Sequence, residues 1–184
     1  HREPRGVVAL ITPWNFPVAI PLRTLVPALL AGNAVIFKPS EVTPRFVVPL
    51  MASVREFPEL AAVFAVVTGD GQTGAALIEQ VDAVCFTGSV ATGRKVAEAC
   101  ARRFIPAFLE LGGKGPFIVE ADANVEDAVN QILKGFCLMQ GEVCCASTRL
   151  YCHEKVYDRF MKLMVERAKK IRIGPIMDPS TQMG

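Results

Sequence analysis

Short apolar runs alternate with helical segments along this chain, and this alternation constrains the fold more than any other feature. Runs rich in β-branched, aromatic and small apolar residues occur at 6–11, 34–37, 63–67, 83–86 and 107–109. Helical patterns separate them, at about 20–30, from just after Pro44, and at 73–80 and 90–103. Strands that are apolar on both faces and separated by helices are typical of a parallel sheet covered on both sides. The alternation therefore predicts an α/β fold.

A second series of elements follows the glycine pair Gly112-Gly113. Its predicted members are a strand, a helix, a strand and an amphipathic helix, at 116–119, 125–136, 150–152 and 155–171. Asn124 precedes the first helix and is a residue type that caps helix N-termini. We expect the glycine pair to mark a boundary between a domain at 1–111 and the start of another at 112–184.

Charge and hydropathy exclude two classes of partner. The 20 basic and 18 acidic residues give a net charge of +2, so no basic surface for nucleic acid is expected. Apolar stretches such as 25–30 are too short to cross a bilayer, and no signal peptide is visible at the start, so no membrane partner is expected. The chain lacks an initiator methionine and stops in a polar turn, which indicates a fragment of a longer protein.

The cysteine pattern indicates thiols rather than a metal site. There are 6 cysteines, at positions 85, 100, 137, 144, 145 and 152. None forms a Cys-x-x-Cys pair, so we expect no zinc and no other metal. Reduced thiols, several within apolar runs, are typical of a cytoplasmic protein with one reactive member.

Two glycine-rich turns lie one strand apart. Residues 69–74 match Gly-x-Gly-x-x-Gly between a strand and a helix, the pattern of a dinucleotide fingerprint. The match is weak alone, because such a turn favours glycine anyway and the acid expected about 20 residues later has no good candidate. Residues 86–94 form a second glycine-rich helix start that suits a phosphate, although Ser89 is equally explained as a helix cap. Together the two turns favour a dinucleotide.

Two short polar segments follow predicted strands. In Lys-Pro-Ser-Glu at 38–41, Lys38 and Glu41 can bind both hydroxyls of a ribose, although a solvated surface turn is the commoner explanation for such a segment in isolation. In Pro-Trp-Asn-Phe-Pro at 13–17, prolines and bulky aromatics hold Asn15 rigidly. Its amide can donate to an oxyanion, and the alternative is a buried turn in which it caps the backbone.

A thiol and a carboxylate are the strongest catalytic candidates. Cys144 lies in Gly-Glu-Val-Cys-Cys-Ala at 141–146, and Glu110 lies in Leu-Glu-Leu-Gly-Gly-Lys at 109–114. An ionised thiol is a strong nucleophile, and a carboxylate can take a proton from it or from water. The alternative for Cys144 is an inert core thiol. With 2 histidines in the chain and neither well placed, a papain-like hydrolase is a poor second choice.

Together and in this order, these motifs resemble the aldehyde dehydrogenase superfamily along all 184 residues. The resemblance implies an oxidoreductase that converts an aldehyde to a carboxylic acid with NAD or NADP through a cysteine thiohemiacetal and thioester. It implies that 1–111 is the C-terminal part of a cofactor-binding domain and 112–184 the N-terminal part of a catalytic domain, in a homodimer or homotetramer. The alternatives are a catalytically silent truncated product and a cofactor-free thiol hydrolase.

The resemblance also assigns residue roles. Cys144 is expected to be the nucleophile, Glu110 the base for the hydrolytic water, and Asn15 part of the oxyanion hole with the Cys144 backbone N–H. The expected cofactor contacts are Trp14, Lys38, Ser40, Glu41, Gly71, Gly88, Ser89, Gly93 and Leu111. Lys38 and Glu41 are expected at the adenosine ribose, where the carboxylate of Glu41 would disfavour the 2′-phosphate of NADP and so favour NAD.

Three departures from the family pattern are visible. Thr24 stands where most members carry lysine, and Glu142 stands where glutamine is commoner. The chain also covers well under half of the family's length, so its Glu-x-Phe-Gly-Pro motif is absent from these residues. The substrate aldehyde therefore does not follow from the sequence.

Overall fold

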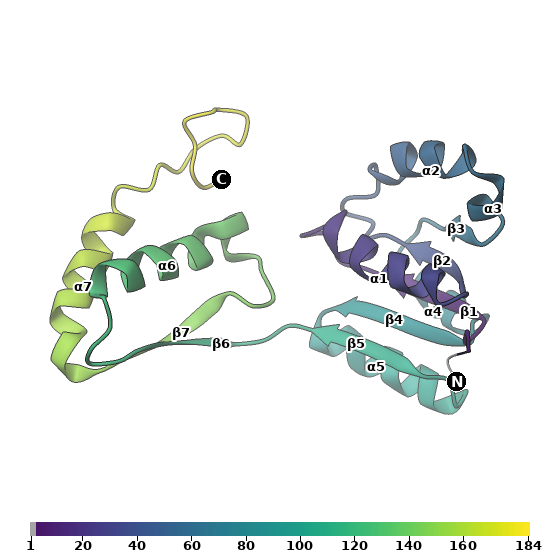
Figure 1. Cartoon of the computed structure of the whole chain (residues 1–184), viewed down its shortest axis with the longest axis horizontal. Coiled ribbons are helices and arrows are strands. Elements are labelled where there is room, and N and C mark those ends of the chain that lie inside the picture. Colours follow the sequence, from purple (N-terminus) through teal and green to yellow (C-terminus); the bar gives the residue numbers. More distant parts are fainter. Residues whose placement is uncertain (1–2) are drawn as a thin grey trace. The chain divides into compact units, whose positions relative to one another are not determined.

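The computed structural model describes residues 3–184. The chain forms two compact units, His1–Leu111 and Gly112–Gly184. The first unit contains a five-stranded parallel sheet in the order β3-β2-β1-β4-β5 (Figure 1). Its strands are β1 Val7–Ile11, β2 Ala34–Lys38, β3 Phe64–Val66, β4 Ala83–Gly88 and β5 Ala107–Leu111. Its helices are α1 Ala19–Leu30, α2 Val47–Arg55, α3 Pro58–Ala61, α4 Gly71–Ile78 and α5 Val90–Arg102.

Alternate side chains of the central strands enter two separate cores. On one face, Leu10 of β1 packs in a cluster with Leu25 of α1 and Val54 of α2. On the other face, Ala9 clusters with residues of α4 and α5 such as Val96. The predicted α/β fold with a parallel sheet is therefore confirmed, and helices cover both faces of its centre.

The edge strand β5 differs from the expectation that strands are apolar on both faces. Its exposure alternates along Ala107–Leu111, and Phe108 is 57% exposed on the same side as Glu110. A strand with one glutamate among its outward residues cannot be buried on that face without a partner for the charge. Within the described residues, α5 covers the opposite face only.

The sheet reverses its strand order between β1 and β4. β1 pairs with β2 on one side and with β4 on the other. Successive strands are therefore added first to one side of β1 and then to its other side. In such sheets, ligands bind outside the carboxyl ends of the strands at this switch point. The segments that begin at Thr12, Pro39 and Ser89 follow the carboxyl ends of β1, β2 and β4. The topology thus brings three predicted motifs to one edge.

The second unit is a smaller α/β layer. Parallel strands β6 Gly115–Val119 and β7 Ser147–Cys152 are connected through α6 Val125–Cys137 and the 3-10 turn η1 Leu138–Gly141, and α7 Glu154–Ala168 follows (Figure 1). Val129 of α6 and Phe160 of α7 are fully buried in its core. Asn124 caps α6 as predicted, because its Oδ1 accepts from Glu126 N at 3.1 Å and Asp127 N at 3.3 Å.

The second helix of this unit is shorter than predicted and has an unexpected cap. It begins at Glu154 and ends at Ala168, whereas the apolar pattern extends to 171. His153 Nδ1 accepts from Lys155 N at 3.2 Å, so this histidine serves as the N-cap. Residues 172–184 then fold into a closed loop, in which Arg172 Nε donates to Ser180 O at 2.6 Å.

Candidate active site

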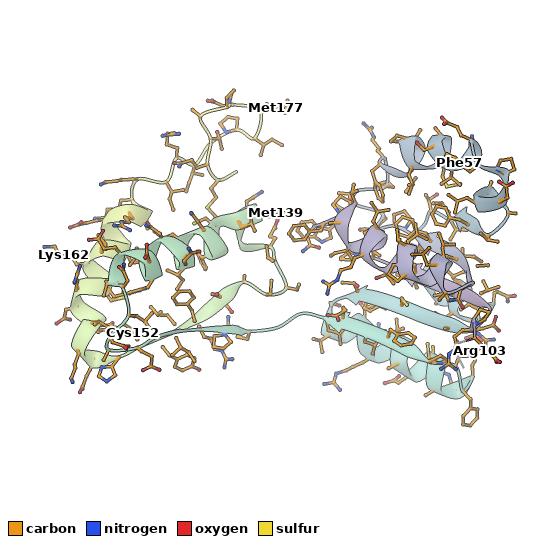
Figure 2. All side chains as sticks on the ribbon, in the orientation of Figure 1. Phe57, Arg103, Met139, Cys152, Lys162 and Met177 are labelled. Carbon is orange, nitrogen blue, oxygen red and sulfur yellow. The ribbon has the colours of Figure 1, made fainter. Side chains whose placement is uncertain are left out.

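A cavity of ≈ 640 Å³ opens between α4 and α5 at the carboxyl edge of the sheet. It gathers seven of the predicted cofactor contacts, namely Trp14, Lys38, Ser40, Glu41, Gly71, Gly88 and Ser89. Arg103, labelled in Figure 2, follows the C-terminal end of α5 and connects this end to the C-terminal end of α4. Its Nη1 donates to Val81 O at 2.8 Å and to Ile78 O. These hydrogen bonds fix the two helices that line the cavity relative to each other within the first unit.

Lys38 is a buried cation in this cavity. Its Nζ donates to Pro39 O at 2.9 Å and lies 3.5 Å from Glu41 Oε2. A buried ammonium needs such partners, because desolvation penalises a charge that is left alone. The Glu41 side chain is 59% exposed, so its oxygens are accessible to a ligand. Gly74 faces the stem of Lys38, and an added Cβ would lie 3.7 Å from Lys38 Cδ.

The two glycine-rich helix starts are capped by different chemistry. Ser89 Oγ accepts from Thr92 N at 3.2 Å, so a neutral hydroxyl caps α5. Asp70 Oδ1 accepts from Gln72 N at 2.9 Å and Thr73 N at 3.4 Å, so a carboxylate occupies the start of α4. An anion at a helix N-terminus competes with a phosphate for the same N–H groups and dipole. The Asp70 cap therefore argues against phosphate binding at Gly-x-Gly-x-x-Gly, whereas the neutral cap leaves the start of α5 as the more favourable predicted anion site.

Gly93 and Leu111 do not line this cavity. A Cβ added at Gly93 would lie 2.5 Å from Leu111 Cδ2, so the glycine allows α5 to pack closely on β5. Both residues therefore shape the site by fixing the distance between helix and sheet. Their direct contact with a cofactor stays a prediction.

Several cavity residues were missed by the sequence analysis. They are Thr12, Glu79, Thr92, Lys95 and Arg102. The face of α5 that continues from Ser89 carries Thr92, Lys95 and Arg102. Extending the helical periodicity from Ser89 would therefore have identified these three residues. Thr12 is buried, and its Oγ1 has no hydrogen-bond partner among the described residues. A buried hydroxyl of this kind is commonly satisfied by a ligand or an ordered water.

Glu110 lies on a different face of the sheet from the cavity. It pairs in register with Thr87 of β4 and lines a groove of ≈ 420 Å³ together with Arg23 and Thr24 of α1. Glu110 is exposed, so its carboxylate is accessible to solvent water. Thr24, the residue at the expected lysine position, thus lines the same groove as the predicted base.

Asn15 lies in the turn that joins β1 to α1. Its Oδ1 atom is buried, and the turn is anchored by Thr43 Oγ1, which donates to Trp14 O at 3.3 Å. The flanking prolines and this anchor explain why the turn is fixed. Asn15 does not line the cavity that contains Trp14.

Cys144 lies in the second unit, on a turn between η1 and β7. Cys144 and Cys145 are both exposed, and Ala146 N donates to Val143 O at 3.0 Å to close the turn. The loop packs against a glycine-containing segment, since a Cβ added at Gly115 would lie 2.8 Å from Ala146 O. Within the second unit Cys144 is therefore not packed in the core, which argues against the core-thiol alternative.

The approach to this loop has an unusual backbone. Met139, Gln140 and Gly141 all adopt positive φ, at 47°, 60° and 78°. Residues with a side chain pay about 1–2 kcal/mol each for this conformation, whereas glycine does not. Two such residues next to each other are therefore a local strain in the backbone.

The thiols of the chain differ in how readily they ionise. Burial raises the pKa of the Cys85, Cys100 and Cys152 thiols. A raised pKa leaves less thiolate at any given pH, and the thiolate is the reactive form. These three cysteines are therefore poor candidates for a nucleophile.

We expect a thiol reagent to modify Cys144 and Cys145 before Cys85, Cys100 and Cys152. The exposed pair is accessible to the reagent, whereas burial reduces the thiolate fraction of the other three. Peptide mapping by mass spectrometry after limited alkylation near neutral pH measures the order. As pH rises, the difference in alkylation rate between the two groups should narrow, because the thiols with a raised pKa gain thiolate last. Equal rates at neutral pH would contradict the burial argument.

Metal binding and membrane insertion are two further possibilities for residues 3–184. No group of three or more histidine, cysteine, aspartate or glutamate side chains is arranged to hold a metal ion in that range. None of the helices formed by these residues has both the length and the apolar character needed to cross a bilayer.

The fold and the cavity define a doubly wound α/β protein with a cavity at its switch point. Comparison with known proteins identifies it further: the chain belongs to the aldehyde dehydrogenase family, whose sequence profile matches residues 1–184.

Named relatives support the same conclusion. The chain is 43% identical over 185 residues to hydroxyisobutyraldehyde dehydrogenase of Mycolicibacterium austroafricanum, covering 99% of the chain and 37% of that protein. It is 41% identical to D-glyceraldehyde dehydrogenase (NADP(+)) of Picrophilus torridus, covering 100% of the chain and 38% of the relative. Lactaldehyde dehydrogenase from Escherichia coli superposes with a TM-score of 0.95 at 36% identity, covering 99% of the chain and 39% of that structure. The chain thus spans less than two fifths of their length.

Proposed function

We propose that these residues are part of an enzyme that oxidises an aldehyde to a carboxylic acid with NAD or NADP. The observation that carries the proposal is the cavity at the switch point. It combines the Lys38–Glu41 pair with the neutral start of α5 at Ser89, in a chain of the aldehyde dehydrogenase family. The exposed thiol of Cys144 supplies the nucleophile that such a reaction needs.

The residues of the cavity fit a dinucleotide. The carboxylate of Glu41 can accept from ribose hydroxyls, and Lys38 has a donor left beyond its two acceptors. The N–H groups at the start of α5 suit a diphosphate. Thr12 Oγ1, which has no hydrogen-bond partner within residues 3–184, is a further polar group at the cavity. When bound, NAD or NADP supplies the hydride acceptor for the oxidation.

The chain's own residues then have the following roles. The Cys144 thiolate adds to the aldehyde carbon and gives a thiohemiacetal, whose oxyanion accepts hydrogen bonds from the Asn15 amide and the Cys144 backbone N–H. After oxidation the acyl group remains on Cys144 as a thioester. Glu110 takes a proton from a water that attacks this thioester, which releases the carboxylic acid and the thiolate.

We also propose the domain organisation, compartment and oligomeric state of the enzyme. Residues 1–111 form the C-terminal part of a cofactor-binding domain, and 112–184 form the N-terminal part of a catalytic domain. The enzyme acts in the cytoplasm as a homodimer or homotetramer. Size measurement by light scattering on the complete polypeptide tests the oligomer, and fractionation of the source cells tests the compartment.

Formation of NADH or NADPH that depends on an aldehyde tests the reaction itself. The complete polypeptide that carries these residues should show it, and the signal should be lost when the aldehyde or the cofactor is omitted. Absence of turnover across straight-chain, branched and hydroxylated aldehydes would favour a catalytically silent product. Ester cleavage that needs no cofactor, without any aldehyde oxidation, would favour a thiol hydrolase.

We expect Glu41→Gln to relax a preference for NAD over NADP. A carboxylate next to a ribose repels a 2′-phosphate, and unit charges about 4 Å apart near a protein surface interact by about 1–4 kcal/mol. The ratio of kcat/KM for NAD to that for NADP should fall by about 5- to 50-fold. Glu56→Gln, at the exposed end of α2, is the matched control. A parent enzyme that prefers NADP would instead show that Lys38, or a group outside these residues, dominates the cofactor preference.

A further inference from the structure

The strained turn that leads to Cys144 is the feature that the proposed mechanism leaves unused. α6 ends at Cys137, and Met139, Gln140 and Gly141 then form one left-handed turn. Glu142 N donates to Met139 O at 2.9 Å and closes this turn. Cys144 follows within three residues of its end, so the direction of the turn sets where the thiol loop begins.

Two other segments lie close to this turn. A Cβ added at Gly141 would lie 3.1 Å from Phe136 O, so the turn folds back tightly onto the end of α6. The side chain of Gln140 lies against the loop formed by 172–184, because a Cβ added at Gly184 would lie 3.2 Å from Gln140 Nε2. Backbone strain persists only where surrounding contacts fix it, and such strain is common at functional sites.

The loop that contacts Gln140 is itself closed. Gln182 N donates to Arg172 O at 2.9 Å, and Gly174 N donates to Met183 O at 3.1 Å. Figure 2 shows Met139 just past the end of α6 and Met177 at the outer part of this closed loop. The loop is therefore a defined support for the turn, contributed by the segment after α7.

We propose that the left-handed turn Met139–Gly141, supported by the 172–184 loop through Gln140, is a positioning element for Cys144. Gln140 is its positioning residue and touches no reacting atom. The proposal rests on the proposed function, since it concerns the thiol that function uses. Its physical basis is that a covalent step depends steeply on geometry, so that a shift of about 1 Å can cost about 100-fold in rate.

The test compares three variants in the complete polypeptide. Gln140→Gly removes the side chain that lies against the 172–184 loop. It also relieves the backbone strain, because glycine adopts positive φ without a steric penalty. Gln140→Asn keeps an amide and a residue type that tolerates positive φ, so it is the conservative rescue. Gln131→Ala, on the exposed face of α6, is the matched control for loss of a glutamine side chain.

For Gln140→Gly we expect a fall in kcat of about 10- to 100-fold with little change in KM. Alkylation of Cys144 by iodoacetamide, which needs no alignment with a substrate, should remain near the parent rate. The thermal midpoint should stay unchanged or rise. Gln140→Asn should recover most of the activity, and Gln131→Ala should resemble the parent. A Gln140→Gly variant with the parent kcat overturns the proposal.

Amide hydrogen exchange gives a readout that does not depend on activity. Exchange at Val143, Cys144 and Cys145 should become about 10-fold faster in Gln140→Gly, and in neither of the other variants. Unchanged exchange in Gln140→Gly overturns the positioning role even if the enzyme is inactive. A parent enzyme without cysteine-dependent turnover would instead contradict the proposed function, while exchange still decides the role of the turn.

Discussion

We expect Cys144→Ala to abolish both aldehyde oxidation and ester hydrolysis in the complete polypeptide. Alanine cannot form the thiohemiacetal or the acyl-enzyme, and removal of a covalent nucleophile typically costs about 10⁴-fold or more in kcat. The substitution is at an exposed turn residue, so the fold should be retained. Steady-state NADH formation and release of p-nitrophenol from an acetate ester measure the two activities.

Cys145 provides the matched control for this experiment. It is exposed on the same turn and differs from Cys144 by one position. Cys145→Ser should retain much of both activities. Full activity in Cys144→Ala, or equal loss in both variants, would contradict the assignment of Cys144 as the nucleophile.

We expect Glu110→Gln to slow hydrolysis of the thioester more than the oxidation that precedes it. General-base help is typically worth about 10²- to 10⁴-fold, and a glutamine cannot take a proton from water. The variant should release a burst of NADH close to one equivalent per site and then turn over slowly. Rapid-mixing fluorescence separates the burst from the steady state.

Glu98→Gln is the control for this substitution, because Glu98 is an exposed carboxylate on α5 outside the cavity and the groove. It should leave both phases unchanged. A Glu110→Gln variant that binds aldehyde and cofactor yet shows no burst would place Glu110 before the oxidation.

The strand and helix pattern could be predicted because the spacing of apolar residues and the presence of capping residues are local features of the sequence. Apolar runs such as 34–37 became strands of the parallel sheet, and Asn124 caps its helix as its side chain allows. The gathering of Lys38, Glu41 and Ser89 could also be anticipated. Each follows the carboxyl end of a parallel strand, and those ends meet at one edge.

Other features depend on contacts between segments that are distant in sequence. The packing of Gly93 against Leu111 needs the distance between α5 and β5, which no motif gives. The position of Glu110 on the groove side follows from the register of β5 with β4. Methionine and glutamine have no preference for positive φ, so the residue types at Met139 and Gln140 do not predict the left-handed turn.

The carboxylate at the start of α4 has a consequence for how glycine-rich patterns are used to detect nucleotide sites. The second residue of Gly-x-Gly-x-x-Gly here is Asp70, which supplies an internal anion to the helix it precedes. A pattern search that ignores this residue scores the segment as a diphosphate loop. Requiring a neutral or glycine residue at that position would set aside segments in which a carboxylate already caps the helix start. Conversely, Asp70→Ser would be a simple way to engineer a second anion site into this scaffold, beside the one at α5.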